Sequence, residues 1–284
     1  MKNHRILNIF NGDCMAEDWR NGKFPGEVLV WRENYLPSFG KIDLSWDCQL
    51  WSQHRAEFLV KTVPELDIKS IKEYLVYMEE ALQADNLKKY DLVYLFFDRC
   101  IYDFGLLMRI FWKLSKIPAG QLPELKLILD DDLIRETPEY WKQKIDESKI
   151  IGSNDLILTA QLYQAYAAGR EAFAAAAESI TLSWHDCYEY DCMRLLCEMP
   201  PPGELTQTEL NILDILKSGA ATPIEIFKKL DNYEKQLFLG DSGCWHILDG
   251  LADRKLIKIE GNEAIVSLCN LSFSQLKSIV VSKL

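Results

Sequence analysis

Four apolar segments alternate with helical segments in the first half of the chain, and this alternation limits the fold more than any other feature of the sequence. The four segments are HRILNIF, EVLVWRE, KYDLVYLFF and LKLILDDD. Strands separated by helices are typical of βαβ units and a largely parallel sheet. The unbroken runs LVYLFF and LKLIL favour strands that are covered on both faces. We therefore predict a Rossmann-like α/β domain with a mostly parallel sheet over residues 1–136.

Helical patterns fill the intervals between these strands and then dominate the middle of the chain. The first group covers 14–20, 47–62, 68–84 and 102–115. Residues 137–199 form a helical segment in which the Ala-rich stretch is a strong helix former. We expect this pattern to continue without a break from Arg170 to Glu198. The run MPPPGE then ends any helix, because proline lacks the N–H group that a helix needs.

Residues 203–284 carry a pattern of their own, typical of a small winged-helix-like domain. Thr206 and Glu209 have the spacing of a capping box, and Pro223 suits the first turn of a second helix. A third helix is predicted over 241–253, followed by a hairpin with its turn at 260–262. A last helix is predicted over 272–282.

Composition narrows the class of partners. The net charge is −11, and the 284 residues have a sequence pI near 5.0. This balance argues against nucleic acid, because contacts to phosphates need clustered Lys and Arg. No apolar run approaches the roughly 20 residues of a membrane-spanning helix, and the start of the chain lacks the apolar stretch of a signal peptide. We therefore expect a cytoplasmic protein without membrane contact, with its eight cysteines reduced.

Several segments also resemble a known family. They are the first strand with its Gly-Asp, then VLVWREN, WSQHRAEFL, YDLVYLFFDRCIYDFGLLMRIFWKL, the Leu-Thr-x-x-Glu helix and FLGDSGCWHILDGLA. In this order they resemble the uncharacterised bacterial family called domain of unknown function (DUF) 1835 together with its companion C-terminal domain. The resemblance covers most of the chain and implies a fold, but it implies no established activity.

The chain departs from that family just after the third strand. Relatives tend to have an acidic residue followed by His-Asp there, and Gln-Leu-Asn a few positions later. Here the strand ends Asp98-Arg99-Cys100, and Phe104-Gly105-Leu106 follow Asp103. If the missing groups perform chemistry in relatives, the resemblance implies that this chain has lost it.

Polar residues stand at four successive strand ends, where an open parallel sheet binds its ligands. They are Gly12, Asp13, Arg32, Glu33, Asp98, Arg99 and Asp103, followed by the loop acids Asp130, Asp131 and Asp132. Arginine can bind a phosphate or carboxylate through paired hydrogen bonds. Carboxylates can hold ribose hydroxyls, or Mg²⁺ through water. This pattern favours a small anionic ligand, phosphorylated or nucleotide-like.

Each of these residues also has a purely structural explanation. Charged residues normally mark the point where a buried strand reaches water, and the glycine-rich phosphate loops are missing. Asp13 follows Gly12 at the start of a helix, and Asp is a favoured N-cap. We therefore predict that Asp13 caps this helix and, by its position, also borders the site.

Other candidate sites have weaker support. Trp51 and Arg55 are four residues apart on one helix face and could frame a ligand ring, or could instead cover the sheet. His185, Cys187, Cys192 and Cys197 cannot converge on zinc if they lie on one continuous helix. Cys14 lies at a helix N-terminus that would lower its pKa, so it could be a catalytic thiol, but the sequence favours a small buried residue. No metal is predicted, and no cofactor is identified.

Two functions remain open on the sequence alone. The first is binding of a small anionic ligand at the strand ends, with catalysis undecided. The second is a non-catalytic regulatory or adaptor protein that docks a protein partner through 203–284. The third helix of that region has three Asp against one Arg and one Lys in DSGCWHILDGLADRK, so it is a poor DNA-reading helix. Its Trp245, Ile247, Leu248 and Leu251 suit a core or a docking face.

Overall fold

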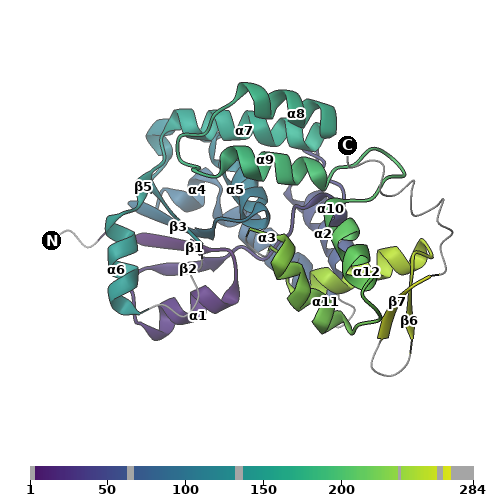
Figure 1. Cartoon of the computed structure of the whole chain (residues 1–284). Coiled ribbons are helices and arrows are strands. Elements are labelled where there is room, and N and C mark those ends of the chain that lie inside the picture. The colour runs from purple at the N-terminus through teal and green to yellow at the C-terminus, as the bar shows by residue number, and fades with distance from the viewer. Residues whose placement is uncertain (1–3, 63–66, 132–136, 236–237, 261–264, 270–284) are drawn as a thin grey trace. The chain divides into compact units, whose positions relative to one another are not determined.

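The computed structural model describes residues 4–62, 67–131, 137–235, 238–260 and 265–269 (Figure 1). The chain divides into two compact units, Met1–Arg194 and Leu195–Leu284. The first unit contains the α/β sheet and the helical middle of the chain, and the described residues of the second contain three α-helices and a hairpin. Within the described residues, every helix is too short or too polar to cross a membrane.

Five strands form the sheet of the first unit, in the order β2-β1-β3-β4-β5. The strands β1 (Ile6–Phe10), β2 (Glu27–Val30), β3 (Leu92–Asp98) and β4 (Glu124–Asp130) run parallel, as the sequence predicts. The edge strand β5 (Lys149–Ile150) is antiparallel to β4 and was not predicted. Two residues are too short a stretch to show the alternation that identifies a strand.

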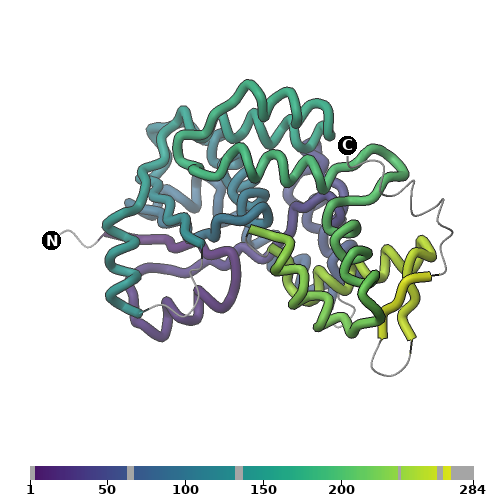
Figure 2. Tube along the Cα trace, viewed as in Figure 1, coloured from purple at the N-terminus to yellow at the C-terminus, as the bar shows by residue number. Residues whose placement is uncertain are grey.

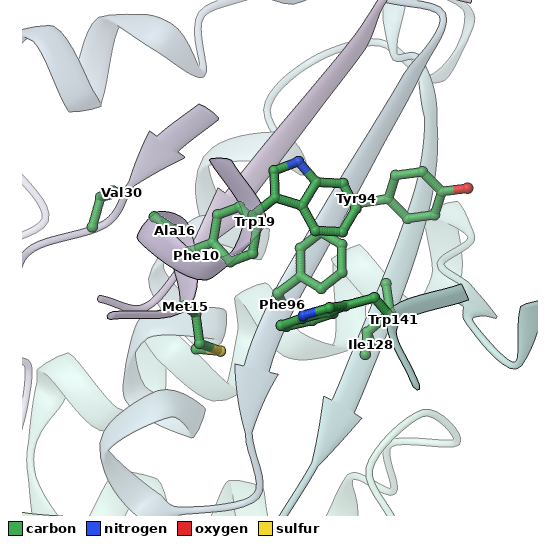
Figure 3. Close-up of a cluster of buried hydrophobic side chains, with 9 residues drawn as sticks. All are labelled: Phe10, Met15, Ala16, Trp19, Val30, Tyr94, Phe96, Ile128 and Trp141. Carbon is green, nitrogen blue, oxygen red and sulfur yellow. The ribbon is translucent and has the colours of Figure 1, made fainter. Parts of the chain in front are cut away.

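One face of the sheet is covered by α1 (Asp13–Asn21) and α6 (Pro138–Asp146). Their indole rings, Trp19 and Trp141, meet edge to face with centroids 5.7 Å apart. Both rings also contact Phe96 of β3, which stacks on Phe10 of β1 at 4.6 Å (Figure 3). These large side chains are fully buried. Their close packing fixes α1, which begins just after the end of β1, against this face of the sheet.

The remaining helices of the first unit largely follow the predicted ranges. They are α2 (Cys48–Thr62), α3 (Ile68–Ala81), α4 (Ala84–Leu87), α5 (Ile101–Leu114), α7 (Ser153–Ala168) and α8 (Arg170–Ser179). Helix α5 packs on α7, and α2 packs on α3. Nearly every side chain of α5 is buried, which fits an apolar helix between the sheet and α7.

The expectation of one helix from Arg170 to Glu198 is wrong. Helix α8 ends at Ser179, residues 180–187 are irregular, and α9 (Tyr188–Cys197) follows (Figure 2). The irregular segment buries Leu182, Trp184 and His185, and the His185 ring stacks on Trp184 and contacts Phe104 of α5. Burial of these aromatic side chains outweighs the helical propensity of the segment.

The second unit contains α10 (Gln207–Leu216), α11 (Pro223–Leu230), α12 (Asp241–Asp253) and the antiparallel strands β6 (Ile257–Glu260) and β7 (Ile265–Leu268). The predicted capping box is confirmed: Thr206 accepts from the N–H of Glu209 at 3.1 Å, and Glu209 accepts from the N–H of Thr206 at 2.8 Å. A second box, at Thr222 and Glu225, was not predicted. The predicted helix over 272–282, and Gly261 and Asn262 of the predicted turn, lie outside the described residues.

Candidate functional site

The strand order creates one point where the chain leaves two neighbouring strands in opposite directions. From β1 the chain passes through α1 to β2, and from β3 it passes through α5 to β4. In open α/β sheets, ligands bind at such a point, beyond the carboxyl ends of the strands. Here the point lies between Asn11, which follows β1, and Asp98, the last residue of β3.

Asn11, Asp98 and Asp103 form a connected group at this point. The amide nitrogen of Asn11 lies 3.4 Å from Asp98 Oδ2 and also donates to Asp103 Oδ2. That same oxygen of Asp103 accepts the backbone N–H of Asp98. Burial raises the pKa of Asp103 well above its usual value, and the neighbouring charge of Asp98 raises it further. The site therefore combines a fully buried carboxyl, whose pKa is raised, with a partly exposed carboxyl, that of Asp98.

Arg32 and Asp13 form an ion pair beside this group. Trp31 donates its backbone N–H to Phe10 O at 2.7 Å, which carries the pairing of β1 and β2 one residue further and brings Arg32 next to α1. Arg32 Nε lies 2.7 Å from Asp13 Oδ2, and Arg32 Nη2 donates to Asp13 Oδ1. The hydrogen bond from Arg32 is the main cause that lowers the pKa of Asp13.

The prediction that Asp13 caps α1 is wrong. Gly12 is the N-cap, in an extended conformation, and Asp13 is the first residue of the helix. The carboxylate of Asp13 bonds to Arg32 rather than to a first-turn N–H group. Asp241 stands in the same position after Gly240 in the second unit. An acid in the first turn still stabilises a helix through the helix dipole.

Glu33 follows β2 and Arg55 lies on α2, as the sequence predicts, but their side chains bind each other. Both side chains are buried and form a paired contact, with Arg55 Nη2 at 2.6 Å and Nε at 3.0 Å from the two Glu33 oxygens. Arg55 also donates to the carbonyl oxygens of Asn34 and Phe39. This pair anchors the irregular segment after β2 to α2, so its groups are committed to the fold and do not face a ligand.

The sequence left open whether Trp51 and Arg55 frame a ligand ring or cover the sheet, and the structure pairs Trp51 with a different arginine. Its ring is 1% exposed, and the guanidinium that lies over it, at 4.8 Å, belongs to Arg109. Arg109 lies at the same distance from the Trp112 ring and pairs with the buried Glu79. We therefore leave Glu33, Trp51 and Arg55 out of the candidate site.

Arg99 belongs to an ionic network at the ends of β3 and β4. Its Nη1 atom lies 3.3 Å from Asp131 and 3.6 Å from Asp130, and its Nη2 atom lies 4.0 Å from Asp186. Asp130 also accepts from Tyr140 at 2.7 Å and pairs with Lys144 at 2.5 Å. Burial raises the pKa of Asp130, but these hydrogen bonds outweigh it and lower the pKa. Asp132 lies outside the described residues.

Three features with weaker support in the sequence were Cys14, the histidine and cysteines near α9, and the apolar side chains of α12. Cys14 is exposed, contrary to the expectation of a buried residue. His185 lies before α9, while Cys192 and Cys197 lie on it, and among the described residues no three metal-ligating side chains are grouped to hold an ion. In α12, three of the four predicted core residues are buried, and Trp245 is 38% exposed.

Asn11 is the site residue that the sequence analysis missed. It stands directly between the first strand and Gly12-Asp13, and its amide connects the residues after β1 with those after β3. A polar residue at a strand end was signal enough to include it. Its partners could be identified only once the order of the strands was known.

Comparisons with known proteins do not identify the chain. No family model and no curated protein sequence matches it. Among solved structures it is similar to the ORC2 protein of Aeropyrum pernix in ADPNP–ADP complexes, at 11% identity, 99% coverage of this chain, 88% of the other and a TM-score of 0.25. Cdc6p of Pyrobaculum aerophilum gives 10%, 99%, 88% and 0.24. At these scores neither likeness bears on fold or function.

Proposed function

We propose that this chain is a cytoplasmic protein that binds a small anionic ligand, phosphorylated or nucleotide-like, at the strand ends between β1 and β3. The observation that carries the proposal is the joining of Asn11 with Asp98 and Asp103 at the point where the chain leaves β1 and β3 in opposite directions. The proposal covers binding, and leaves open whether a reaction follows.

The chemistry of the site supports two contacts. The partly exposed carboxyl group of Asp98 suits the hydroxyl groups of a sugar, and the buried Asp103 holds the Asn11 amide beside it. Arg32 uses two of its five N–H donors on Asp13, and its side chain is 49% exposed, so it can present further donors to an anion. The N-terminus of α1 adds backbone N–H groups. Among the described residues, apart from the chain neighbours of Gly12, no atom lies within 4 Å of where a Cβ on Gly12 would stand.

We also propose a fold class for each of the two units. We assign the first unit to the Rossmann-like class on its strand order and the second to the winged-helix-like class on three helices followed by a hairpin. We also propose that the chain is related to the DUF 1835 family, because the segments that resemble this family include Asp13, Arg32 and Asp98.

A thermal-shift screen tests the proposal. Nucleotides and phosphorylated sugars are added to the wild type and to Arg32→Ala, Asp98→Asn and the control Arg254→Ala. Arg254 is the matched control, because it is an exposed arginine in an ion pair with Glu209 in the second unit. We expect at least one ligand to stabilise the wild type and the control but neither site variant. A broad panel without any shift would refute the proposal.

A second candidate function is docking of a protein partner by the second unit. It is favoured by two exposed apolar side chains, Ile224 on α11 at 63% and Trp245 on α12 at 38%. The test is capture of a partner by the full chain, compared with Ile224→Ser and Trp245→Ser. A partner retained equally by all three proteins would exclude these side chains as its docking site.

A further inference from the structure

The Arg32–Asp13 pair places one of the chain's own carboxylates on the arginine that a ligand anion would use. The two side chains meet in the paired geometry that arginine forms with carboxylates and phosphates alike. Asp13 thus has the position and charge that a bound anion would have. A ligand could replace Asp13 in this way only if Arg32 keeps its position after the Asp13 side chain moves away.

Tyr74 holds Arg32 independently of Asp13. The Arg32 Cζ atom lies 4.4 Å from the centre of the Tyr74 ring, a distance typical of a cation–π contact. The ring is fixed in turn, because the Tyr74 hydroxyl donates to Val30 O at 2.6 Å, on the strand that leads to Arg32. The guanidinium is therefore supported from one side by α3 and β2, and Asp13 occupies another side.

The pair is also easy to open. The Arg32 and Asp13 side chains are 49% and 57% exposed, and exposed ion pairs are weak because water competes for both charges. Asp13 stands in the first turn of α1, where its charge is favourable whether or not it contacts Arg32. An arriving anion can therefore replace Asp13 on Arg32 without disturbing the helix.

We infer that Asp13 is an intramolecular competitor that a ligand phosphoryl group displaces from Arg32. This inference rests on the proposed function and names the part of the ligand that enters beside α1. A phosphoryl group has three terminal oxygens, so it can bind Arg32 and still accept from the first-turn N–H groups of α1. A carboxylate has two oxygens, and the paired contact with Arg32 engages both, so it has no third oxygen for those N–H groups.

If Asp13 instead supports ligand binding, removal of its charge has the opposite effect on ligand affinity. If Asp13 positions Arg32 for the ligand, or bonds to the ligand itself, then removal of its charge weakens binding. If Asp13 competes with the ligand, removal of its charge strengthens binding. Glu17 is the matched control, because it is an exposed acid one turn further along the same face of α1.

Calorimetric titration separates these cases. Inorganic phosphate, AMP and adenosine are titrated at constant ionic strength into the wild type, Asp13→Asn, Glu17→Gln, Arg32→Ala and Arg32→Lys. We expect Asp13→Asn to bind phosphate and AMP about fivefold more tightly than the wild type, the upper range for loss of an exposed ion pair. Glu17→Gln should stay within about twofold, and both Arg32 variants should bind more weakly.

Two results overturn the inference while the proposed function stands. One is phosphate or AMP binding that Asp13→Asn leaves unchanged or weakens. The other is an equal gain in Glu17→Gln, which would show a general effect of charge. A different result, no binding of phosphate or AMP by the wild type or by Asp13→Asn, would refute binding of a phosphorylated ligand here. Binding of adenosine equal to that of AMP would contradict the role of the phosphoryl group.

Discussion

The amide of Asn11 and the carboxyl of Asp103 join two parts of the chain that are 92 residues apart. The contact lies across the gap between β1 and α5, and it brings a buried carboxyl to the edge of the sheet where the ligand is proposed to bind. Because Asp103 is buried beside Asp98, its protonation connects the stability of the fold with the state of the site.

Asp103→Asn should change how stability depends on pH. The pKa of Asp103 is raised in the folded state, so between its unfolded and folded pKa values the native protein binds a proton that the unfolded chain has released. Stability from this group is then greatest below about pH 4, near the unfolded value, and falls as pH rises to the folded pKa. The slope is at most about 1.4 kcal/mol per pH unit. The variant should lack this fall.

Urea denaturation of both proteins between pH 4 and pH 8 measures the effect. The free energy of unfolding of the wild type should decline relative to that of Asp103→Asn as pH rises. Parallel curves would show that Asp103 releases its proton at the same pH in the folded and unfolded states. Asp131→Asn is the control, because Asp131 is an exposed acid at the neighbouring strand end.

Arg55→Ala should destabilise the first unit strongly. It would leave Glu33 buried without its partner, and breaking a buried pair from one side costs about 3–5 kcal/mol. Glu33→Gln combined with Arg55→Met should cost much less than the sum of the two single changes, because no lone charge remains buried. Lys41→Ala, which breaks a surface ion pair with Asp43, should change the free energy of unfolding far less than Arg55→Ala does.

Urea titrations of the single and double variants provide this comparison. Single changes that cost no more than Lys41→Ala would contradict the structural role given to the pair. If the same variants lose affinity for the ligand but keep their stability, Arg55 is part of the ligand site after all.

The sequence predicts the sheet better than it predicts the site. Strands such as Leu92–Asp98 are buried runs whose apolar pattern is local, so their existence can be read directly. Asp13 shows the limit: its position after a strand was clear, but its partner Arg32 depends on which strands are neighbours. Arg55 shows a second limit, because a buried arginine and an exposed one have the same sequence signature.

Thr206→Ala should loosen the start of α10 in the second unit. The change removes a side-chain acceptor of the capping box, and such losses typically cost about 1 kcal/mol. Hydrogen exchange of the first-turn amides of α10 should quicken about fivefold, which corresponds to that free energy. Ser242→Ala is the control, because its neighbour Asp241 rather than Ser242 supplies the side-chain acceptor there. Unchanged exchange in Thr206→Ala would show that α10 does not depend on the box.

Gly12→Ala should separate binding from folding. A Cβ at Gly12 meets no atom within 4 Å in the described part of the chain beyond its two neighbours, and the backbone there is extended. The change should therefore cost about 1 kcal/mol or less as an N-cap replacement. The new methyl group would occupy the space beside α1 through which the ligand is proposed to approach. We therefore expect phosphate to bind about tenfold more weakly, a loss of about 1.4 kcal/mol.

Gly26→Ala is the matched comparison at the opposite end of β2. Gly26 has a φ of +105°, and a Cβ there would stand 2.9 Å from Ile6 O and 2.5 Å from Asn8 Nδ2, so the change should cost about 1–3 kcal/mol or more in stability. Any Gly26→Ala protein that remains folded should bind phosphate as the wild type does, because the change is remote from the strand ends. Calorimetry and urea denaturation of both variants test the pair. Unaltered phosphate affinity in Gly12→Ala would move the ligand away from α1.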